Sequence, residues 1–265
     1  MIVSEALTFA RSLGVDRLDA QLLLAHLLRQ DRGWLICHDD APVDEALLRA
    51  LFVRRAAGEP LAYLVGEKEF HGLQLRVTPD TLVPRPDTEV LVDWAIELLT
   101  PNSSVVDLGT GSGAIALAIK HDQPGAQVHA VDLSPAALAV AEDNARRLGL
   151  EVNFHQGSWL APLAGRKFNV IVSNPPYIAG GDPHLPALRY EPVSALTPGG
   201  DGLSDLRTII DTAPQHLVSG GWLLLEHGYD QAEAVAAALR ARGFMEPSLR
   251  RDLGGNPRAT GGRLP

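Results

Sequence analysis

Strand-like and helix-like segments alternate along the chain from about residue 103, and this alternation limits the fold more than any other feature of the sequence. Short apolar runs predict strands at 104–108, 127–132, 152–155, 168–173 and 221–226. Helical segments follow most of them, at 114–120, 135–148 and 231–242. Ser134 is placed to cap the second of these helices and Gly149 to end it. The alternation predicts an α/β fold with a doubly wound, mostly parallel sheet.

The first 80 residues have a different pattern. Leucines recur at helical spacing within 18–27, after Asp16 as a candidate N-cap. The alternating stretch 70–77 predicts a strand or a hairpin. We therefore expect two domains, a small helical N-terminal domain with a hairpin linker over residues 1–80 and the α/β domain over residues 81–265. The helical domain fits partner recognition and a purely structural cap about equally well.

Composition disfavours several classes of protein. No run approaches the ~20 apolar residues of a membrane-spanning helix, and the first residues lack a signal-peptide pattern, so we expect a cytoplasmic protein with no membrane partner. The single cysteine, Cys37, excludes an intramolecular disulfide, and we expect it to be buried. The nine histidines show no metal-binding spacing, which predicts no metal. The formal net charge of −9 disfavours a nucleic-acid partner, because phosphate binding normally needs a basic surface.

A glycine-rich turn joins the first predicted strand of the α/β domain to its helix. It reads Asp107-Leu108-Gly109-Thr110-Gly111-Ser112-Gly113-Ala114. The glycines allow a sharp turn and a close approach to a ligand, which predicts a nucleoside-type cofactor over this strand. Asp132 ends the second strand, where an acidic side chain can bind ribose hydroxyls or serve only as a turn residue before the next helix. These features fit a dehydrogenase and a transferase equally well.

A second motif, Ser173-Asn174-Pro175-Pro176-Tyr177, directly follows the fourth strand. Ligands of open α/β sheets sit beyond the carboxyl ends of the strands, so this segment should face the cofactor. The amide oxygen of Asn174 and the carbonyl of Pro175 are two acceptors that suit one planar NH2 group. The Tyr177 ring can stack on that group. The motif favours a transferase that acts on an amide or amino nitrogen over a dehydrogenase.

Together, the glycine turn, Asp132 and the Asn-Pro-Pro-Tyr segment resemble class I methyltransferases that act on amino or amide nitrogens. Further segments resemble one branch of them, the HemK/PrmC-type peptide chain release factor glutamine N5-methyltransferases, over nearly the whole chain. These segments are Pro84-Arg85-Pro86-Asp87-Thr88-Glu89, 168–178, Glu191-Pro192, Ala195-Leu196, Asp201-Gly202-Leu203 and 223–228. The tail at 252–259 departs from the family pattern, and Pro257 there predicts irregular strand pairing.

The resemblance implies a Rossmann-like class I methyltransferase domain that uses S-adenosyl-L-methionine and releases S-adenosyl-L-homocysteine. The cofactor contacts it implies are Gly109, Thr110, Gly111, Ser112, Gly113, Asp132, Trp159 and Asn174. Judged from the sequence alone, Trp159 fits the hydrophobic core as well. The substrate glutamine would be held by Asn174, Pro175, Pro176 and Tyr177, and the catalytic residues would be Asn174, Pro175 and Tyr177.

The reaction implied by the resemblance is methyl transfer to N5 of the glutamine in the Gly-Gly-Gln motif of class I peptide chain release factors. Such factors would then be the partner, and translation termination the setting. Several alternatives stay open at this point. A ribosomal-protein glutamine would suit the same chemistry. An exocyclic amine of DNA or RNA would require base extrusion and a basic channel. A nucleotide-binding oxidoreductase or a non-catalytic adaptor would leave the Asn-Pro-Pro-Tyr segment without a use.

Overall fold

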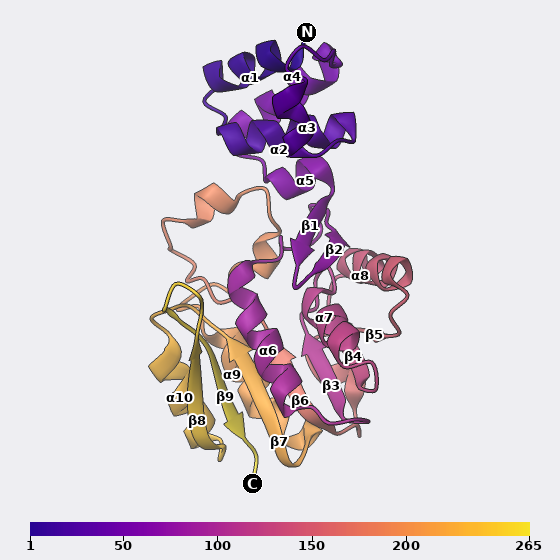
Figure 1. Ribbon diagram of the computed structural model, residues 1–265. Coiled ribbons are helices and arrows are strands. Elements are labelled where there is room, and N and C mark those ends of the chain that lie inside the picture. The colour runs from indigo at the N-terminus through magenta and orange to yellow at the C-terminus, as the bar shows by residue number, and fades with distance from the viewer. The chain divides into compact units, whose positions relative to one another are not determined.

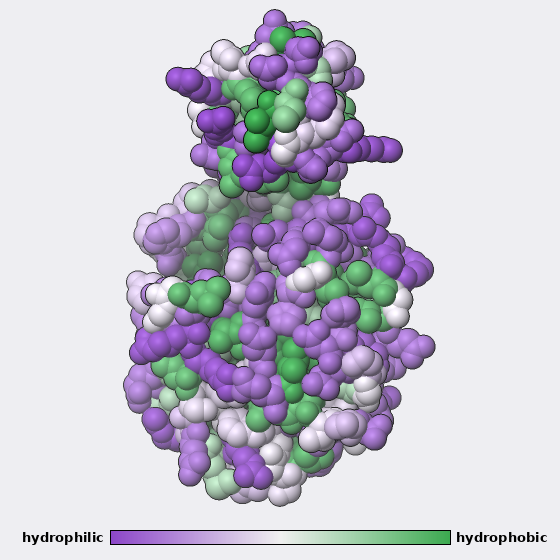
Figure 2. Space-filling view, viewed as in Figure 1, coloured by the Kyte–Doolittle hydropathy of each residue, from purple (hydrophilic) through white to green (hydrophobic).

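The computed structural model describes residues 1–265 and divides into two compact units, Met1–Glu67 and Lys68–Pro265. The sequence predicts the division near residue 80, with the hairpin on its N-terminal side. The hairpin strands are β1 (Glu67–Phe70) and β2 (Leu73–Arg76), so most of the hairpin groups with the second unit. None of the helices combines the length and the apolar character that a membrane-spanning helix requires. Figure 2 shows a mostly hydrophilic face on which hydrophobic residues form scattered patches.

The N-terminal unit consists of five helices around a small apolar core (Figure 1). They are α1 (Val3–Ser12), α2 (Arg17–Leu28), α3 (Arg32–Cys37), α4 (Glu45–Ala56) and α5 (Leu61–Val65). The predicted helix after Asp16 is confirmed, because the Asp16 carboxylate accepts from the Leu18 N–H at 2.7 Å and so begins α2. The expected burial of Cys37 is wrong. It ends α3 with its side chain exposed.

The second unit is built on a seven-stranded sheet in the order β5-β4-β3-β6-β7-β9-β8. Its strands are β3 (Ser104–Leu108), β4 (Gln127–Asp132), β5 (Asn153–Gln156), β6 (Phe168–Ser173), β7 (Leu217–Glu226), β8 (Met245–Arg251) and β9 (Pro257–Arg263). The pairings from β5 to β7 are all parallel, whereas β9 runs antiparallel to both of its neighbours. The predicted doubly wound, mostly parallel sheet is thus confirmed.

Helices cover both faces of this sheet (Figure 1). They are α6 (Glu89–Leu98), α7 (Ala114–Asp122) and α8 (Pro135–Leu148) on one face, and α9 (Ser204–Thr212) and α10 (Ala232–Ala241) on the other. Neighbouring strand residues point to opposite cores, since Val105 packs with α6 and α7 while Val106 packs with α9 and α10. Both faces of the strands are buried, which explains their continuous apolar runs in the sequence.

The irregular pairing that Pro257 predicted is found between β9 and β8, where the register shifts at both ends of the ladder. Pro257 is the first residue of the strand and its pairing with Arg251 is shifted in register. From Ala259 onward β9 pairs with β7 and β8 on either side. The expectation is therefore confirmed for the pairing with β8 and wrong for the pairing with β7, which has no register shift. A proline at the first position of a strand removes no hydrogen bond from the rest of the ladder.

Asn144 of α8 connects the hairpin to the glycine turn. Its side chain donates to the carbonyls of Arg76 and Ser112, both at 2.9 Å, and accepts from the Arg76 N–H at 2.7 Å. The side chain is completely buried, so these bonds are shielded from water. This single amide fixes the end of β2 against the glycine turn.

Candidate active site

The candidate site lies where the carboxyl ends of β3, β4 and β6 meet. Leu108, at the end of β3, pairs with Val131 on one side and with Ser173 on the other. The Ser173 hydroxyl donates to the Leu108 carbonyl at 2.7 Å, which joins the two strand ends. Parts of the glycine turn and of the Asn-Pro-Pro-Tyr segment, together with Asp132, border one pocket of about 690 Å³. This volume is typical of cofactor sites.

Two glycines of the turn line the pocket. Gly109 and Gly111 do so with φ of 75° and 56°, a backbone region that glycine adopts without strain. Gly113 serves packing instead. A Cβ at Gly113 would stand 2.9 Å from the Leu117 side chain and 3.2 Å from that of Ala141. Glycine at this position therefore lets α7 begin close to α8.

Thr110 and Ser112, the two hydroxyl residues of the turn, are buried. Thr110 donates to the Asp107 carboxylate at 2.6 Å, and the carbonyl of Ser112 is held by Asn144. Asp107 is completely buried, and this burial raises its carboxyl pKa to about 7. The residues that line the pocket do not include Thr110 or Ser112. Their predicted cofactor contacts would involve the backbone, while the Thr110 side chain and the Ser112 carbonyl keep the turn in shape.

Asp132 lines the pocket and also holds its rim. One carboxylate oxygen accepts from the Gly111 N–H at 2.8 Å, and the other accepts from the Ser134 N–H at 2.9 Å. Ser134 itself caps α8 by accepting from the Ala137 N–H at 3.2 Å, as predicted. A carboxylate has about four acceptor positions, so Asp132 retains acceptor capacity for ribose hydroxyls.

Acidic side chains give the pocket a negative lining. Asp80, Asp132 and Asp205 belong to it, and none of its lining residues is a lysine, arginine or histidine. S-adenosylmethionine carries a sulfonium and an ammonium group, which such a lining attracts. The same carboxylates would repel the pyrophosphate of a dinucleotide. The pocket therefore fits a cationic nucleoside cofactor and disfavours the oxidoreductase alternative.

Asp132→Ala is expected to weaken cofactor binding by ~1–3 kcal/mol, the usual contribution of hydrogen bonds that involve a charged group. Calorimetry with S-adenosylhomocysteine measures the effect. Asp143→Ala is the matched control, because Asp143 lies on α8 but does not line the pocket. That variant should bind as the unchanged protein does. Equal affinities for all three proteins would exclude Asp132 from the cofactor site.

Trp159 forms a wall of the pocket and part of the core at once. Its indole ring lies 3.4 Å from the position of a Cβ on Gly109 and lines the pocket. The same side chain packs against the core under α9 and α10. Its φ of 48° is a left-handed conformation that a bulky residue adopts only under constraint. The two expectations for Trp159, cofactor contact and core, are thus compatible.

The Asn-Pro-Pro-Tyr segment is braced by the chain around it. The Tyr177 carbonyl accepts from the Gln231 side chain at 2.9 Å, and the Ile178 N–H donates to the Leu196 carbonyl at 3.0 Å. The side-chain nitrogen of Asn174 donates to the Thr88 hydroxyl at 3.2 Å. The segment is therefore held from three separate parts of the α/β unit.

Two acceptors of this segment are not used by the protein. No residue of the chain donates a hydrogen bond to Asn174 Oδ1 or to the Pro175 carbonyl. Asn174 and Pro176 line the pocket, whereas Pro175 and Tyr177 do not. The two unused oxygens are those that the sequence analysis assigned to a planar NH2 group.

A buried polar cluster behind Tyr177 was not predicted from the sequence. The Tyr177 hydroxyl donates to Glu226 at 3.3 Å and accepts from Arg258 at 3.4 Å. Arg258 also forms ion pairs with Asp252 at 3.0 Å and Asp87 at 3.1 Å. Burial raises the pKa of the Glu226 carboxyl to about 7. Burial and the nearby Glu226 carboxyl raise the pKa of Tyr177 well above its ordinary value.

Glu226 makes the stability of the protein depend on pH. Its carboxyl pKa is 4.5 ordinarily and about 7 in the folded protein, so the folded state holds this proton more tightly. The stability that protonation contributes is complete below pH ~4.5 and is lost as pH rises to ~7. Glu226→Gln does not titrate. Its stability relative to the unchanged protein should therefore rise by on the order of 1–3 kcal/mol between pH 5 and 8.

Urea unfolding of both proteins at several pH values measures this difference. Glu97→Gln is a suitable control, because a hydrogen bond from Arg250 lowers the pKa of this exposed carboxyl instead. Its stability difference should not rise over the same range. A constant difference between Glu226→Gln and the unchanged protein from pH 5 to 8 would show that Glu226 stays ionised in the folded state.

His227, the other polar residue at the end of β7, is unsuited to act as a base. Its Nδ1 donates to the Gly228 carbonyl at 2.8 Å, so its Nε2 accepts from the Thr260 hydroxyl, at 2.7 Å. The ring is completely buried, and burial lowers its pKa. Both ring nitrogens are thus engaged away from the pocket.

Two of the segments that carry the family resemblance, 84–89 and Glu191-Pro192, contact each other. The buried carboxylate of Glu191 accepts from the Val83 N–H at 3.0 Å and from the Arg85 guanidinium. The proline-rich turn that contains Arg85 leads directly to Thr88, which contacts Asn174. Segments more than 100 residues apart in the sequence therefore meet behind the pocket.

Two family models match this chain. The methyltransferase small domain matches residues 87–234, and the PrmC N-terminal domain matches residues 4–66. Among solved structures, a methyltransferase from Pyrococcus furiosus is similar with a TM-score of 0.57 at 18% identity, covering 81% of this chain and 96% of that one. At that identity the likeness concerns the fold, and it agrees with the doubly wound sheet described above.

Two curated relatives are similar over nearly their whole length. A release factor glutamine methyltransferase from Bordetella pertussis is 50% identical over 259 residues, which cover 95% of this chain and 96% of the relative. One from Burkholderia pseudomallei is 49% identical over 269 residues, covering 96% and 94%. Such identity over both units, at a site with this pocket and this Asn-Pro-Pro-Tyr segment, shows that the chain belongs to the release factor glutamine methyltransferase family.

Proposed function

We propose that this enzyme transfers a methyl group from S-adenosylmethionine to the side-chain nitrogen, N5, of the glutamine in the Gly-Gly-Gln motif of class I peptide chain release factors. One observation carries the proposal beyond the family name. Asn174 Oδ1 and the Pro175 carbonyl are two acceptors without a donor in the protein, beside a pocket that suits the cofactor. A primary amide has two N–H groups to offer them.

The chemistry requires alignment more than activation. An amide nitrogen is a poor nucleophile, because its lone pair is shared with the carbonyl. S-adenosylmethionine supplies an activated methyl group on its sulfonium sulfur. When Asn174 and Pro175 accept both amide hydrogens, the plane of the amide is fixed and the nitrogen can face that methyl group. Such positioning can lower a barrier by ~7–11 kcal/mol.

The two acceptors also stabilise the charge that develops on the nitrogen. The bond between methyl group and sulfur breaks as the bond to nitrogen forms, and the amide becomes positively charged. Preorganised acceptors favour that state over the neutral amide. The resulting cation is a strong acid, so one of its two N–H protons leaves without a dedicated base. This agrees with the position of His227, whose nitrogens are both engaged elsewhere.

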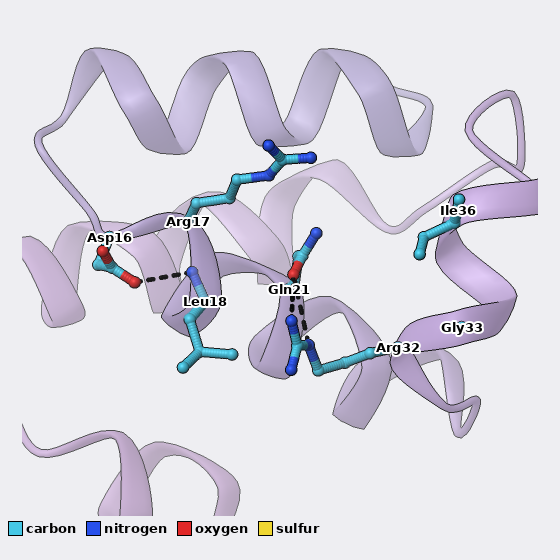
Figure 3. Close-up of a pocket in the computed structure, with 7 residues that line it drawn as sticks. All are labelled: Asp16, Arg17, Leu18, Gln21, Arg32, Gly33 and Ile36. Carbon is cyan, nitrogen blue, oxygen red and sulfur yellow. Dashed lines mark hydrogen bonds between the residues drawn. The ribbon is translucent and has the colours of Figure 1, made fainter.

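The N-terminal unit is proposed to help dock the folded release factor. It has a surface pocket of about 590 Å³ lined by residues of α2 and α3, including Arg17 and Arg32 (Figure 3). Two apolar side chains of this pocket are exposed, Leu18 by 44% and Ile36 by 76%. Exposed apolar residues beside arginines are typical of protein-binding surfaces.

Three methyl-accepting substrates distinguish this proposal from methylation of any primary amide. The release factor should be the best substrate, a short Gly-Gly-Gln peptide intermediate, and free glutamine worst by about 10³-fold or more in kcat/KM. Remote contacts normally supply the energy that positions the reacting group, and each tenfold step is about 1.4 kcal/mol. Kinetics with labelled S-adenosylmethionine measure the three values. Similar kcat/KM values for the peptide and the release factor would rule out a contribution from docking of the folded factor.

Ile36→Glu refines this test. It should lower kcat/KM for the factor and leave that for the peptide unchanged, because Ile36 belongs to the pocket of the N-terminal unit. Val53→Glu is the matched control, since Val53 is 54% exposed on α4 and does not line that pocket. Equal losses for the two variants would place the docking surface elsewhere.

A further inference from the structure

The side chain of Asn174 can serve the reaction in only one of its two orientations. Its Oδ1 can accept an amide hydrogen, whereas its Nδ2 can only donate. A rotation of about 180° around the last side-chain bond exchanges the two atoms at little cost to shape. Without a fixed partner, the wrong atom would face the acceptor glutamine part of the time. A contact with another residue must therefore fix which of the two Asn174 atoms points into the pocket.

Thr88 makes the contact that can decide this. The Nδ2 of Asn174 donates to its hydroxyl oxygen at 3.2 Å, and no other side chain of the protein holds the Asn174 amide. Thr88 is the last residue of the short 3-10 turn Pro86–Thr88 and directly precedes α6, and it is only 4% exposed. Its backbone N–H donates to the Arg85 carbonyl at 3.0 Å, which holds the residue in the turn.

A hydroxyl can also donate, so its single hydrogen must be used elsewhere for the contact to be selective. Glu226 offers an acceptor for that hydrogen, because its Oε2 is buried without a hydrogen-bond partner. Thr88 is also one of the groups that lower the pKa of the Glu226 carboxyl, against the larger effect of burial. The same carboxyl accepts from the Tyr177 hydroxyl at 3.3 Å. When the hydrogen of Thr88 turns to this unpartnered oxygen, the Thr88 oxygen is left as an acceptor toward Asn174. Only Nδ2 can satisfy it, and Oδ1 then faces away.

We propose that Thr88 is a positioning residue whose hydroxyl oxygen holds Asn174 Nδ2 and thereby directs Oδ1 toward the acceptor nitrogen. The inference rests on the proposed function, because it needs Oδ1 to be the atom that meets the substrate. It also gives the proline-rich segment 84–89 a role in the reaction, although that segment lies far from Asn174 in the sequence.

Thr88→Val tests the proposal, because valine keeps the shape of threonine and removes the hydroxyl. We expect kcat to fall by about 10- to 100-fold, the range for a misplaced reacting group, with the KM values and the calorimetric Kd for S-adenosylhomocysteine nearly unchanged. Thr88→Ser, which keeps the hydroxyl, should restore kcat to within about threefold. Thr88→Ala is a second variant without the hydroxyl and should behave as Thr88→Val. Thermal unfolding of each variant reports any loss of the fold.

A double-mutant cycle with Asn174→Ala separates this role from a general structural one. If Thr88 acts through Asn174, then Thr88→Val lowers single-turnover rates in the unchanged protein and not in the Asn174→Ala background. Equal losses in both backgrounds, an unchanged kcat in Thr88→Val, or equal kcat values for Thr88→Val and Thr88→Ser would overturn the proposal. All rates are measured on whichever acceptor the unchanged enzyme labels. A different acceptor would refute the proposed function while the cycle still reports on Thr88.

Discussion

Asn174→Ala is expected to lower kcat by about 100-fold or more while the protein keeps its fold. The side chain provides one of the two acceptors for the target amide, and its loss removes both orientation and charge stabilisation in the transition state. The substitution leaves the Thr88 hydroxyl without its partner. The loss of a single hydrogen bond of that kind costs the fold only ~1 kcal/mol.

Kinetics at saturating concentrations of both substrates and thermal unfolding together decide this prediction. Ser194→Ala is the matched control, because Ser194 lines the same pocket and has no part in the proposed reaction. Its kcat should stay within about threefold of the unchanged value, a change of less than 1 kcal/mol in the barrier. A melted Asn174→Ala protein, or one with normal kcat, would show that Asn174 has a structural role only.

Gly202→Ala is expected to cost ~2–4 kcal/mol of stability and to impair turnover in the protein that remains folded. A Cβ at this position would stand 2.3 Å from the Tyr177 carbonyl oxygen and 3.1 Å from the Ala179 nitrogen. The backbone φ of 78° adds strain for any residue but glycine. Relief of the clash requires a shift of the Asn-Pro-Pro-Tyr backbone, and overpacking of this kind typically costs ~1–3 kcal/mol in addition to strain.

Substitutions at two other glycines distinguish the steric clash expected in Gly202→Ala from its backbone strain. Gly200 has a φ of 54° with nothing within 4 Å of a Cβ, so Gly200→Ala should show the strain alone, ~1 kcal/mol, with normal kcat. Gly181 has an open Cβ position without that strain, and Gly181→Ala should be neutral. Urea unfolding and kcat are measured for all three variants. If Gly202→Ala matches Gly200→Ala, the close approach to Tyr177 does not shape the site.

Local patterns made much of the site predictable. The glycine turn lies between a strand and a helix, and Ser134 caps the next helix; both signals depend on residues a few positions apart. The placement of the Asn-Pro-Pro-Tyr segment beside the turn follows from a general property of parallel sheets, whose strand ends share one edge. Short-range chemistry and topology therefore sufficed to predict which segments meet.

Contacts between distant segments were not predictable in the same way. Thr88 contacts Asn174 across 86 residues, and Tyr177 contacts Glu226 across 49. No periodicity or cap signal links such pairs, because their proximity arises only when the sheet is assembled. Arg258 lies on β9, a strand whose opening proline argued against pairing. The side chains that support the active segment thus come from parts of the chain where local signals were weak or misleading.

The most direct test of the account is to locate the methyl group. The enzyme is incubated with labelled S-adenosylmethionine and a mixture of purified release factor, ribosomes and duplex DNA, and the labelled product is analysed by mass spectrometry. The account predicts one added methyl group on N5 of the glutamine in the Gly-Gly-Gln motif of the release factor, and none after Asn174→Ala. Label in ribosomal protein, RNA or DNA, with the release factor unlabelled, would contradict it.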